Sequence, residues 1–101
     1  MKKYVYIFHV DGPVDMTGKV GEDTMRWFEN LGSKLIDGGN PFNPKAEARI
    51  SGGKVDMDSD TAGGYCIVNA ENLEEAVTMA MTNPMANMAG CSVKVYETMP
   101  M

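Results

Sequence analysis

Near residue 71, an apolar segment of the chain changes into an amphipathic one. The apolar run spans residues 63–70 and begins with two glycines, a pattern typical of a buried β-strand. Asn72 and Glu75 follow with the spacing of a helix capping box, and Pro84 marks a position where a helix would end. The sequence therefore predicts a strand at residues 63–70, followed by a helix that begins at Asn72 and ends before Pro84.

A first strand is predicted at residues 3–10, where large apolar side chains follow one another without a break. Successive side chains of a strand point to opposite faces, and here both faces are apolar. One face carries Tyr4, Tyr6 and Phe8, and the other carries Val5 and Ile7. Either side of this strand is therefore suited to burial.

The next amphipathic segment predicts a helix that begins between Val20 and Thr24 and runs to the glycines at positions 38 and 39. Its apolar side chains recur at spacings of three and four residues: Met25, Phe28, Leu31 and Leu35, flanked by Trp27 and Ile36. Gly32 falls inside this helix, where glycine costs about 1 kcal/mol relative to alanine. We therefore expect another segment to pack closely against Gly32.

Two short runs, residues 46–51 and 54–57, lie on either side of Gly52-Gly53. They predict a β-hairpin, because a tight hairpin turn needs residues that adopt positive φ. An acidic loop at residues 58–62 follows, and a last strand is predicted at Cys91–Glu97.

The order of these elements predicts a single α+β domain that spans residues 1–101. It is the order of a ferredoxin-like βαββαβ antiparallel sheet, with two helices on one face and an extra β-hairpin. If the helices cover one face, the side chains expected beneath them are Val5, Ile7, Cys66, Val68, Val93 and Val95. The side chains expected on the opposite face are Tyr4, Tyr6, Phe8, Tyr65, Ile67 and Tyr96.

A monomer would expose this aromatic face as an apolar patch larger than soluble monomers usually carry. We therefore expect two copies to pair through it as a homodimer, which closes a dimeric α+β barrel. Cover by the chain's own loops or by another partner is an alternative. A base-stacking platform for single-stranded nucleic acid is a more remote one, since residues 64–68 resemble part of an RNA-recognition motif.

Composition narrows the range of partners. The chain has 101 residues, 44% hydrophobic content and a formal net charge of −5. Phosphate backbones and anionic membranes repel an acidic protein, which disfavours both as partners. No apolar run is close to the length of about 20 residues that crosses a bilayer. The two cysteines lack the spacing of a zinc site or a disulfide framework, so we expect reduced thiols, no metal, no cofactor and a cytoplasmic location.

His9 is the only histidine and the candidate catalytic residue, because imidazole exchanges protons near neutral pH. The alternative is a half-exposed histidine that bonds to backbone or water. Cys66 and Cys91 are interpreted as small buried hydrophobic residues, because no base or helix N-terminus that would stabilise a thiolate lies near them in the sequence.

The aromatic face would also suit a ligand cavity, since hydroxyls and two other polar groups would project from an apolar wall. The candidate ligand-binding residues are Tyr4, Tyr6, Tyr65, Asn69, Lys94 and Tyr96. The alternative is that they form the dimer core, with their hydroxyls bonded across the interface.

Five segments, in the right order, resemble the YCII-related (DGPF) domain family within the dimeric α+β barrel group. They are residues 3–7, 49–55, 63–68, 72–76 and 92–95. The Gly-Gly-Tyr strand and the capped helix after it are the most specific part of the match. The resemblance implies a ferredoxin-like homodimer. An activity of the lyase, isomerase or monooxygenase type is then the alternative to a ligand-binding or purely structural module.

Two motifs of that family are altered in this chain. Where similar proteins carry Asp-Gly-Pro-Phe after the hairpin, this chain has Asp58-Ser59-Asp60-Thr61. Some relatives have a histidine near the first helix and an acid before the proline that ends the second. Here the first region offers Glu22 and Asp23, and the pre-proline residue is Asn83. The resemblance therefore assigns no histidine–aspartate pair to this chain.

Overall fold

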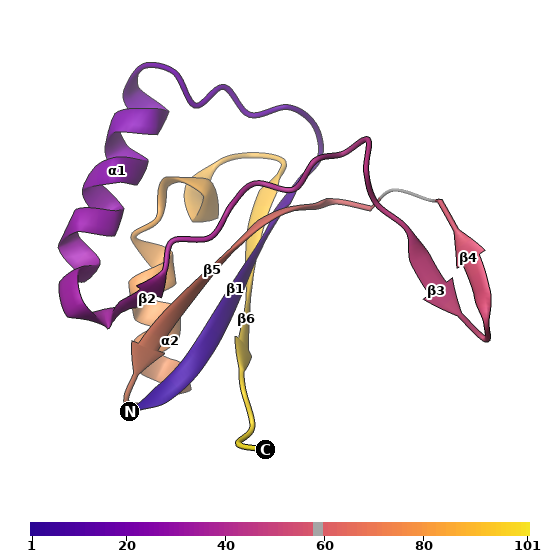
Figure 1. The fold of residues 1–101 in the computed structure, drawn as a ribbon. Coiled ribbons are helices and arrows are strands. Elements are labelled where there is room, and N and C mark those ends of the chain that lie inside the picture. The colour runs from indigo at the N-terminus through magenta and orange to yellow at the C-terminus, as the bar shows by residue number, and fades with distance from the viewer. Residues whose placement is uncertain (58–59) are drawn as a thin grey trace.

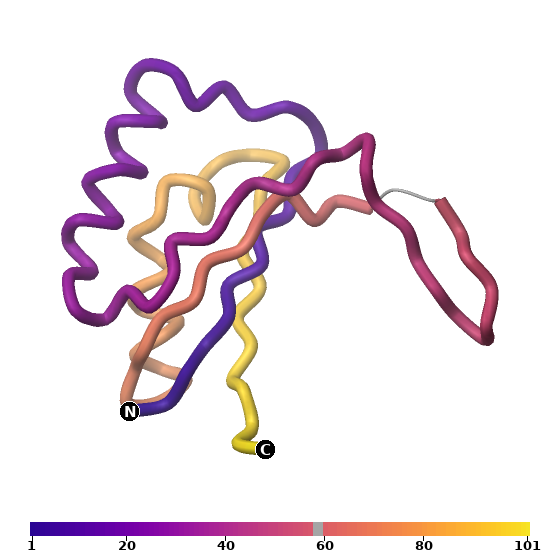
Figure 2. The backbone as a smooth tube through the Cα atoms, viewed as in Figure 1, coloured from indigo at the N-terminus to yellow at the C-terminus, as the bar shows by residue number. Residues whose placement is uncertain are grey.

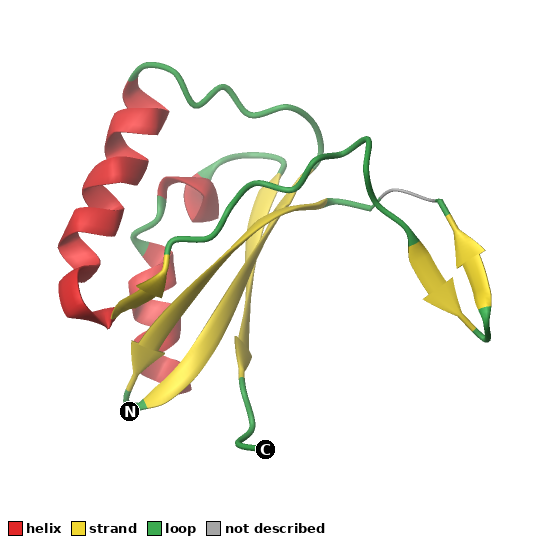
Figure 3. Cartoon of the chain, in the orientation of Figure 1, coloured by secondary structure: helices red, strands yellow, loops and turns green. Residues whose placement is uncertain are grey.

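The computed structural model describes residues 1–57 and 60–101, and its centre is a four-stranded antiparallel sheet with the order β2-β5-β1-β6 (Figure 1). The strands are β1 (Lys2–Val10), β2 (Leu35–Asp37), β5 (Ala62–Ala70) and β6 (Cys91–Glu97). Helices α1 (Lys19–Leu31) and α2 (Leu73–Met81) both cover one face of this sheet (Figure 3). A separate hairpin consists of β3 (Arg49–Ser51) and β4 (Lys54–Asp56). This is the predicted ferredoxin-like α+β fold with an extra hairpin.

Helix α2 begins and ends where the sequence predicts. The Asn72 Oδ1 atom accepts a hydrogen bond from the Glu75 backbone N–H at 2.8 Å and so caps the first turn. The helix stops two residues before Asn83, and Pro84 starts the 3-10 turn η2 (Pro84–Asn87). No helix in the described residues is long and apolar enough to cross a membrane.

Helix α1 is shorter than predicted. It ends at Gly32, whose φ is 56°, a conformation that glycine adopts at little cost. The 3-10 turn η1 (Gly32–Lys34) then leads into β2, where Leu35 pairs with Val68. The expectation of a helix that continues to the glycines at positions 38 and 39 is therefore wrong. The expectation of close packing at Gly32 is also wrong, since a Cβ there would meet no atom within 4 Å.

The two faces of β1 are the reverse of those predicted. Tyr4 lies opposite Val68, and Tyr6 lies between Cys66 and Val95, so these rings share the face that the helices cover. Tyr4 and Tyr6 are both fully buried. Because both faces of this strand are apolar, alternation alone cannot identify its inner face. The pairing register with β5 and β6 decides it.

The same register places Val5 and Ile7 on the side without helices, where they are half-buried. Their expected cover by the helices is therefore wrong, and so is the expected outward position of Phe8, which is 9% exposed and belongs to the core. On the other two strands the expected inner residues are confirmed. They are Cys66, Val68, Val93 and Val95.

The hydroxyl and indole groups of the buried aromatic side chains form hydrogen bonds within the chain. The Tyr6 hydroxyl donates to the Ala76 carbonyl at 2.5 Å, and the Tyr4 hydroxyl donates to Glu97 Oε1 at 2.7 Å. Burial, with a further contribution from Glu97, raises the pKa of Tyr4 to about 12. The Trp27 indole N–H donates to a carbonyl of α2 at 3.0 Å. Large aromatic side chains can therefore fill this core without unsatisfied hydroxyl or indole groups.

The hairpin β3–β4 confirms the predicted turn and stands apart from the sheet. Gly52 and Gly53 both have positive φ, 58° and 76°. Every residue of the two strands is exposed, and Figure 2 shows the hairpin extending away from the rest of the chain. The radius of gyration is accordingly 14.6 Å, against about 13 Å for a compact domain of this length. Residues 58 and 59 of the predicted acidic loop lie outside the described residues.

Candidate functional site

The side of the sheet without helices, termed the open face, carries alternate residues of three strands (Figure 3). Antiparallel pairing arranges them in rows. Ile7 lies between Tyr65 and Lys94, and Val5 lies between Ile67 and Tyr96. The open face consists of Val5, Ile7, His9, Tyr65, Ile67, Asn69, Ser92, Lys94 and Tyr96. It therefore has an aliphatic centre with aromatic and polar groups around it.

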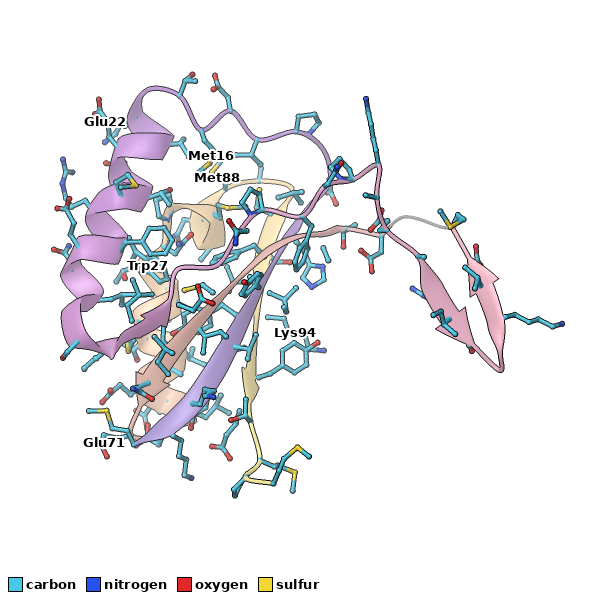
Figure 4. The ribbon with its side chains drawn as sticks, in the orientation of Figure 1. Met16, Glu22, Trp27, Glu71, Met88 and Lys94 are labelled. Carbon is cyan, nitrogen blue, oxygen red and sulfur yellow. The ribbon has the colours of Figure 1, made fainter. Side chains whose placement is uncertain are left out.

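Four of the six predicted ligand-binding residues lie on the open face: Tyr65, Asn69, Lys94 and Tyr96. The Lys94 ammonium lies 5.3 Å from the centre of the Tyr96 ring, a distance typical of a cation–π contact. Figure 4 shows Lys94 on the side of the sheet away from Trp27. Tyr4 and Tyr6 are buried under the helices, so the expectation that they line a cavity on the open face is wrong.

Tyr65 is held by the segment that follows β2. The Phe42 ring stacks on it, with ring centres 5.9 Å apart and 18° between the planes. The Phe42 backbone N–H donates to the Gly63 carbonyl at 2.9 Å, which pairs the segment with β5. Gly39 makes this approach possible, because a Cβ there would lie 1.8 Å from the Tyr65 carbonyl oxygen. This edge of the open face is therefore fixed by backbone pairing.

A polar pocket of about 450 Å³ opens at the end of the open face, beside the His9–Ser92 row. It is lined by His9, Asp11, Thr61, Gly90, Cys91 and Ser92. The β1–β5 register shifts between Phe8 and His9, and such irregularities often re-aim a side chain beside a functional site. The pocket volume lies within the range of small-molecule sites, about 300–1,000 Å³.

The pocket brings an imidazole and a carboxylate together. His9 Nδ1 lies 2.9 Å from Thr61 Oγ1, within hydrogen-bonding distance. The Asp11 backbone N–H donates to the Gly90 carbonyl at 2.9 Å, which joins the loop after β1 to the loop before β6. A Cβ at Gly90 would lie 3.4 Å from Asp11 Oδ2, so the Asp11 carboxylate sits close over this glycine. These groups can accept a proton from a bound molecule or donate one to it.

Of the residues that line this pocket, His9 is predicted to be catalytic and Cys91 to be a small buried hydrophobic residue. Asp11 stands two residues further along the chain, but strand alternation does not extend into the loop that begins there, so the sequence does not predict that the two side chains are neighbours. The Val10 backbone N–H donates to the Thr61 carbonyl at 2.8 Å and keeps the two segments together beyond the strand. Thr61 and Ser92 carried no sequence signal of their own.

The two cysteines lie in different environments. Cys66 is fully buried, and burial raises the pKa of its thiol to about 11, which disfavours a nucleophilic thiolate. Cys91 is half-buried and borders the polar pocket. Both thiols are free, and β1 separates their strands. In residues 1–57 and 60–101, no three His, Cys, Asp or Glu side chains are grouped so as to hold a metal ion.

A second groove, of about 590 Å³, lies between α1 and α2 on the other side of the molecule. Asp23 borders it and forms an ion pair with Lys19 at 3.1 Å. Asn83 is 2% exposed, and its Oδ1 atom accepts a hydrogen bond from the Met85 N–H at 2.8 Å. Asp23, one of the two acids in the region where some relatives have a histidine, is therefore engaged in an ion pair, and Asn83, the residue before the proline, caps η2.

Comparisons with known proteins establish the fold alone. No protein-family model matches the chain, and no curated protein matches it significantly. Among solved structures, the chain is similar to 5-chloro-2-hydroxyhydroquinone dehydrochlorinase from Burkholderia phenoliruptrix AC1100, in complex with 2,5-dihydroxybenzoquinone. The two share 19% sequence identity and a TM-score of 0.51, over 90% of each chain.

Proposed function

We propose that this chain forms a homodimer through the open face and binds a small organic molecule at the polar pocket beside His9. The observation that carries the proposal is the place of this pocket. Imidazole, carboxylate and hydroxyl groups gather at the end of an apolar sheet face that neither helix covers. An apolar wall with a few converging polar groups is the usual composition of a small-molecule site.

The accessible surface of the whole chain supports an interface with a second copy. The chain exposes 7082 Å², whereas a folded monomer of 11.0 kDa is expected to expose about 5,600 Å². The excess, about 1,500 Å², is larger than the area of about 800 Å² that each partner buries in a standard interface. Two-fold pairing of identical surfaces is the commonest way to bury such an area.

Membership of the YCII-related (DGPF) family and a cytoplasmic location are part of this proposal. The segments that resemble that family support it, and so does the fold shared with the dehydrochlorinase. The name of that enzyme contains a chlorinated hydroxyhydroquinone. Its structure was solved in complex with a dihydroxybenzoquinone. A single ring with hydroxyl or keto groups is the ligand class that we propose, since those groups can bond to the imidazole, carboxylate and hydroxyl groups that line the pocket.

Catalysis is the second candidate, because His9 and Asp11 line the same pocket. In this version His9 acts as a general base toward a ligand hydroxyl. The reaction classes are a lyase, an isomerase or a monooxygenase-like activity. The dehydrochlorinase neighbour favours the lyase among them.

The nucleic-acid alternative loses its basis. A base-stacking platform needs aromatic side chains on the two central strands of the sheet. Tyr4, Tyr6 and Phe8 of β1 lie in the core, and Tyr65 of β5 already stacks on Phe42.

The test is an NMR titration of the full chain with catechol, hydroquinone and 2,5-dihydroxybenzoquinone. We expect the largest amide shifts at His9, Asp11 and Ser92. His9→Gln should weaken binding about fivefold, the effect of losing one hydrogen bond worth about 1 kcal/mol. Glu29→Gln, on α1, is the control and should change nothing. Shifts confined to the groove between the helices, or no shift with any probe, would contradict the proposal. Turnover of a probe that His9→Gln abolishes would favour the enzyme version.

A further inference from the structure

We propose that the hairpin arm, residues 45–57, embraces the second copy of this chain, with Ile50 and Val55 packed against the partner. The inference rests on the dimer proposed above and adds a second contact to it. Ile50 and Val55 lie directly opposite each other in the β3–β4 ladder, so they form one apolar face. Their exposed fractions are 74% and 64%. Arg49 and Ser51 alternate onto the other face.

The arm lacks the burial that normally stabilises a hairpin. An isolated two-stranded hairpin is marginally stable in water, and here each strand has three residues, all exposed. Met57, just beyond β4, is 71% exposed as well. A surface that covers these side chains would supply the missing burial.

The direction in which the arm projects and the size of the excess exposed surface both indicate that the covering surface belongs to a second copy. In Figures 1 and 4 the arm projects to the side of the sheet where Lys94 lies, away from both helices. A copy seated on the open face would occupy this side. Strand spacing and rise give the open face a footprint of about 500 Å², which is less than half of the excess surface of about 1,500 Å². The arm carries exposed apolar area beyond that face.

Charge favours this chain as its own partner. The arm has three basic and two acidic residues, a net charge of +1, which leaves −6 on the rest of the chain. A positive arm is attracted to the acidic body of a second copy, and such complementarity guides association. In a two-fold dimer both arms make the contact, so each substitution in the arm acts twice.

The test is the dimer dissociation constant, measured by analytical ultracentrifugation. The double variant Ile50→Thr/Val55→Thr keeps the β-branched side chains that favour the hairpin and removes apolar groups from its packed face. We expect the dissociation constant to rise at least about a hundredfold, because four side chains per dimer lose apolar burial. Ser51→Thr, on the opposite face of the same hairpin, is the matched control and should leave the constant unchanged.

Hydrogen exchange gives a second measurement that needs no substitution. The β3 and β4 amides should exchange slowly in the dimer and rapidly after dilution to the monomer. Wild-type association of the double variant, together with fast exchange in the dimer, would overturn the inference. Ile67→Asp, on the open face, tests the dimer itself. Dissociation by Ile67→Asp alone would retain the proposed dimer and reject the arm, whereas a monomer at micromolar concentration would reject both.

Discussion

Replacing Gly39 with alanine tests whether backbone pairing holds the edge of the open face beside Tyr65. Gly39 has a φ of 70°, and a Cβ there would lie 1.8 Å from the Tyr65 carbonyl oxygen, where real contacts stay above 3.0 Å. The left-handed conformation costs an alanine about 1 kcal/mol. Relief of the clash would also separate this segment from β5. The hydrogen bonds at risk are Phe42 N–H to Gly63 O at 2.9 Å and Tyr65 N–H to Asn40 O at 3.4 Å. At about 1 kcal/mol for each bond, the total loss is about 3 kcal/mol.

The neighbouring glycine provides the control. Gly38 has no positive φ, and a Cβ there would lie 3.6 Å from the Phe28 ring, an ordinary contact. Gly38→Ala should therefore be neutral or stabilising by up to about 1 kcal/mol, because alanine restricts the unfolded chain. Urea unfolding at one protein concentration measures both variants. With a slope of about 1.5 kcal/mol per molar, Gly39→Ala should lower the midpoint by about 2 M. Equal midpoints for the two variants would refute the reasoning.

Two further predictions concern the core hydroxyls. Tyr6→Phe removes the donor to the Ala76 carbonyl, bonded at 2.5 Å, so the thermal midpoint should fall by about 4–8 °C, the equivalent of about 1 kcal/mol; an unchanged midpoint would contradict this. The Tyr4 hydroxyl, which donates to Glu97, holds the pKa of that carboxyl below its ordinary value of 4.5. The unfolded state therefore binds this proton more readily, and the resulting stabilisation is present above pH 4.5 and lost as the pH falls further. Glu97→Gln should reduce the acid sensitivity of the unfolding free energy, and a pH profile parallel to that of the unaltered chain would contradict this.

The fold could be predicted because its main elements carry independent local signals. The Asn72 cap sets the start of α2, and Gly52-Gly53 sets the turn of the hairpin. Strand β2 could not be predicted, since it has three residues and Leu35 keeps helical spacing from Leu31. The end of α1 depends on the φ of Gly32, and a glycine in an amphipathic pattern is compatible with either a helix interior or a helix end.

The candidate site could be predicted only in part, because its pocket joins segments that are distant in sequence. His9 and Thr61, whose side chains lie 2.9 Å apart, are separated by 52 positions. No periodicity links such residues, and their proximity follows from the β1–β5 pairing and its register shift. Asp11 contacts Gly90 through a hydrogen bond between two loops. The alternation of side chains along a strand does not predict contacts between loops.

The faces of β1 decide where the imidazole of His9 lies. His9 shares its face with Val5 and Ile7, so outward tyrosines would have placed it beneath the helices. Tyrosines that point inward fill the space between sheet and helices with larger side chains than Val5 and Ile7 would. The Tyr6 hydroxyl still donates a hydrogen bond to the Ala76 carbonyl. A buried imidazole in their place would need a partner of its own to offset desolvation. The packing that fills the core with rings therefore also sets His9 beside Ser92 at the end of the open face, and it leaves aliphatic side chains at the centre of that face for a partner to cover.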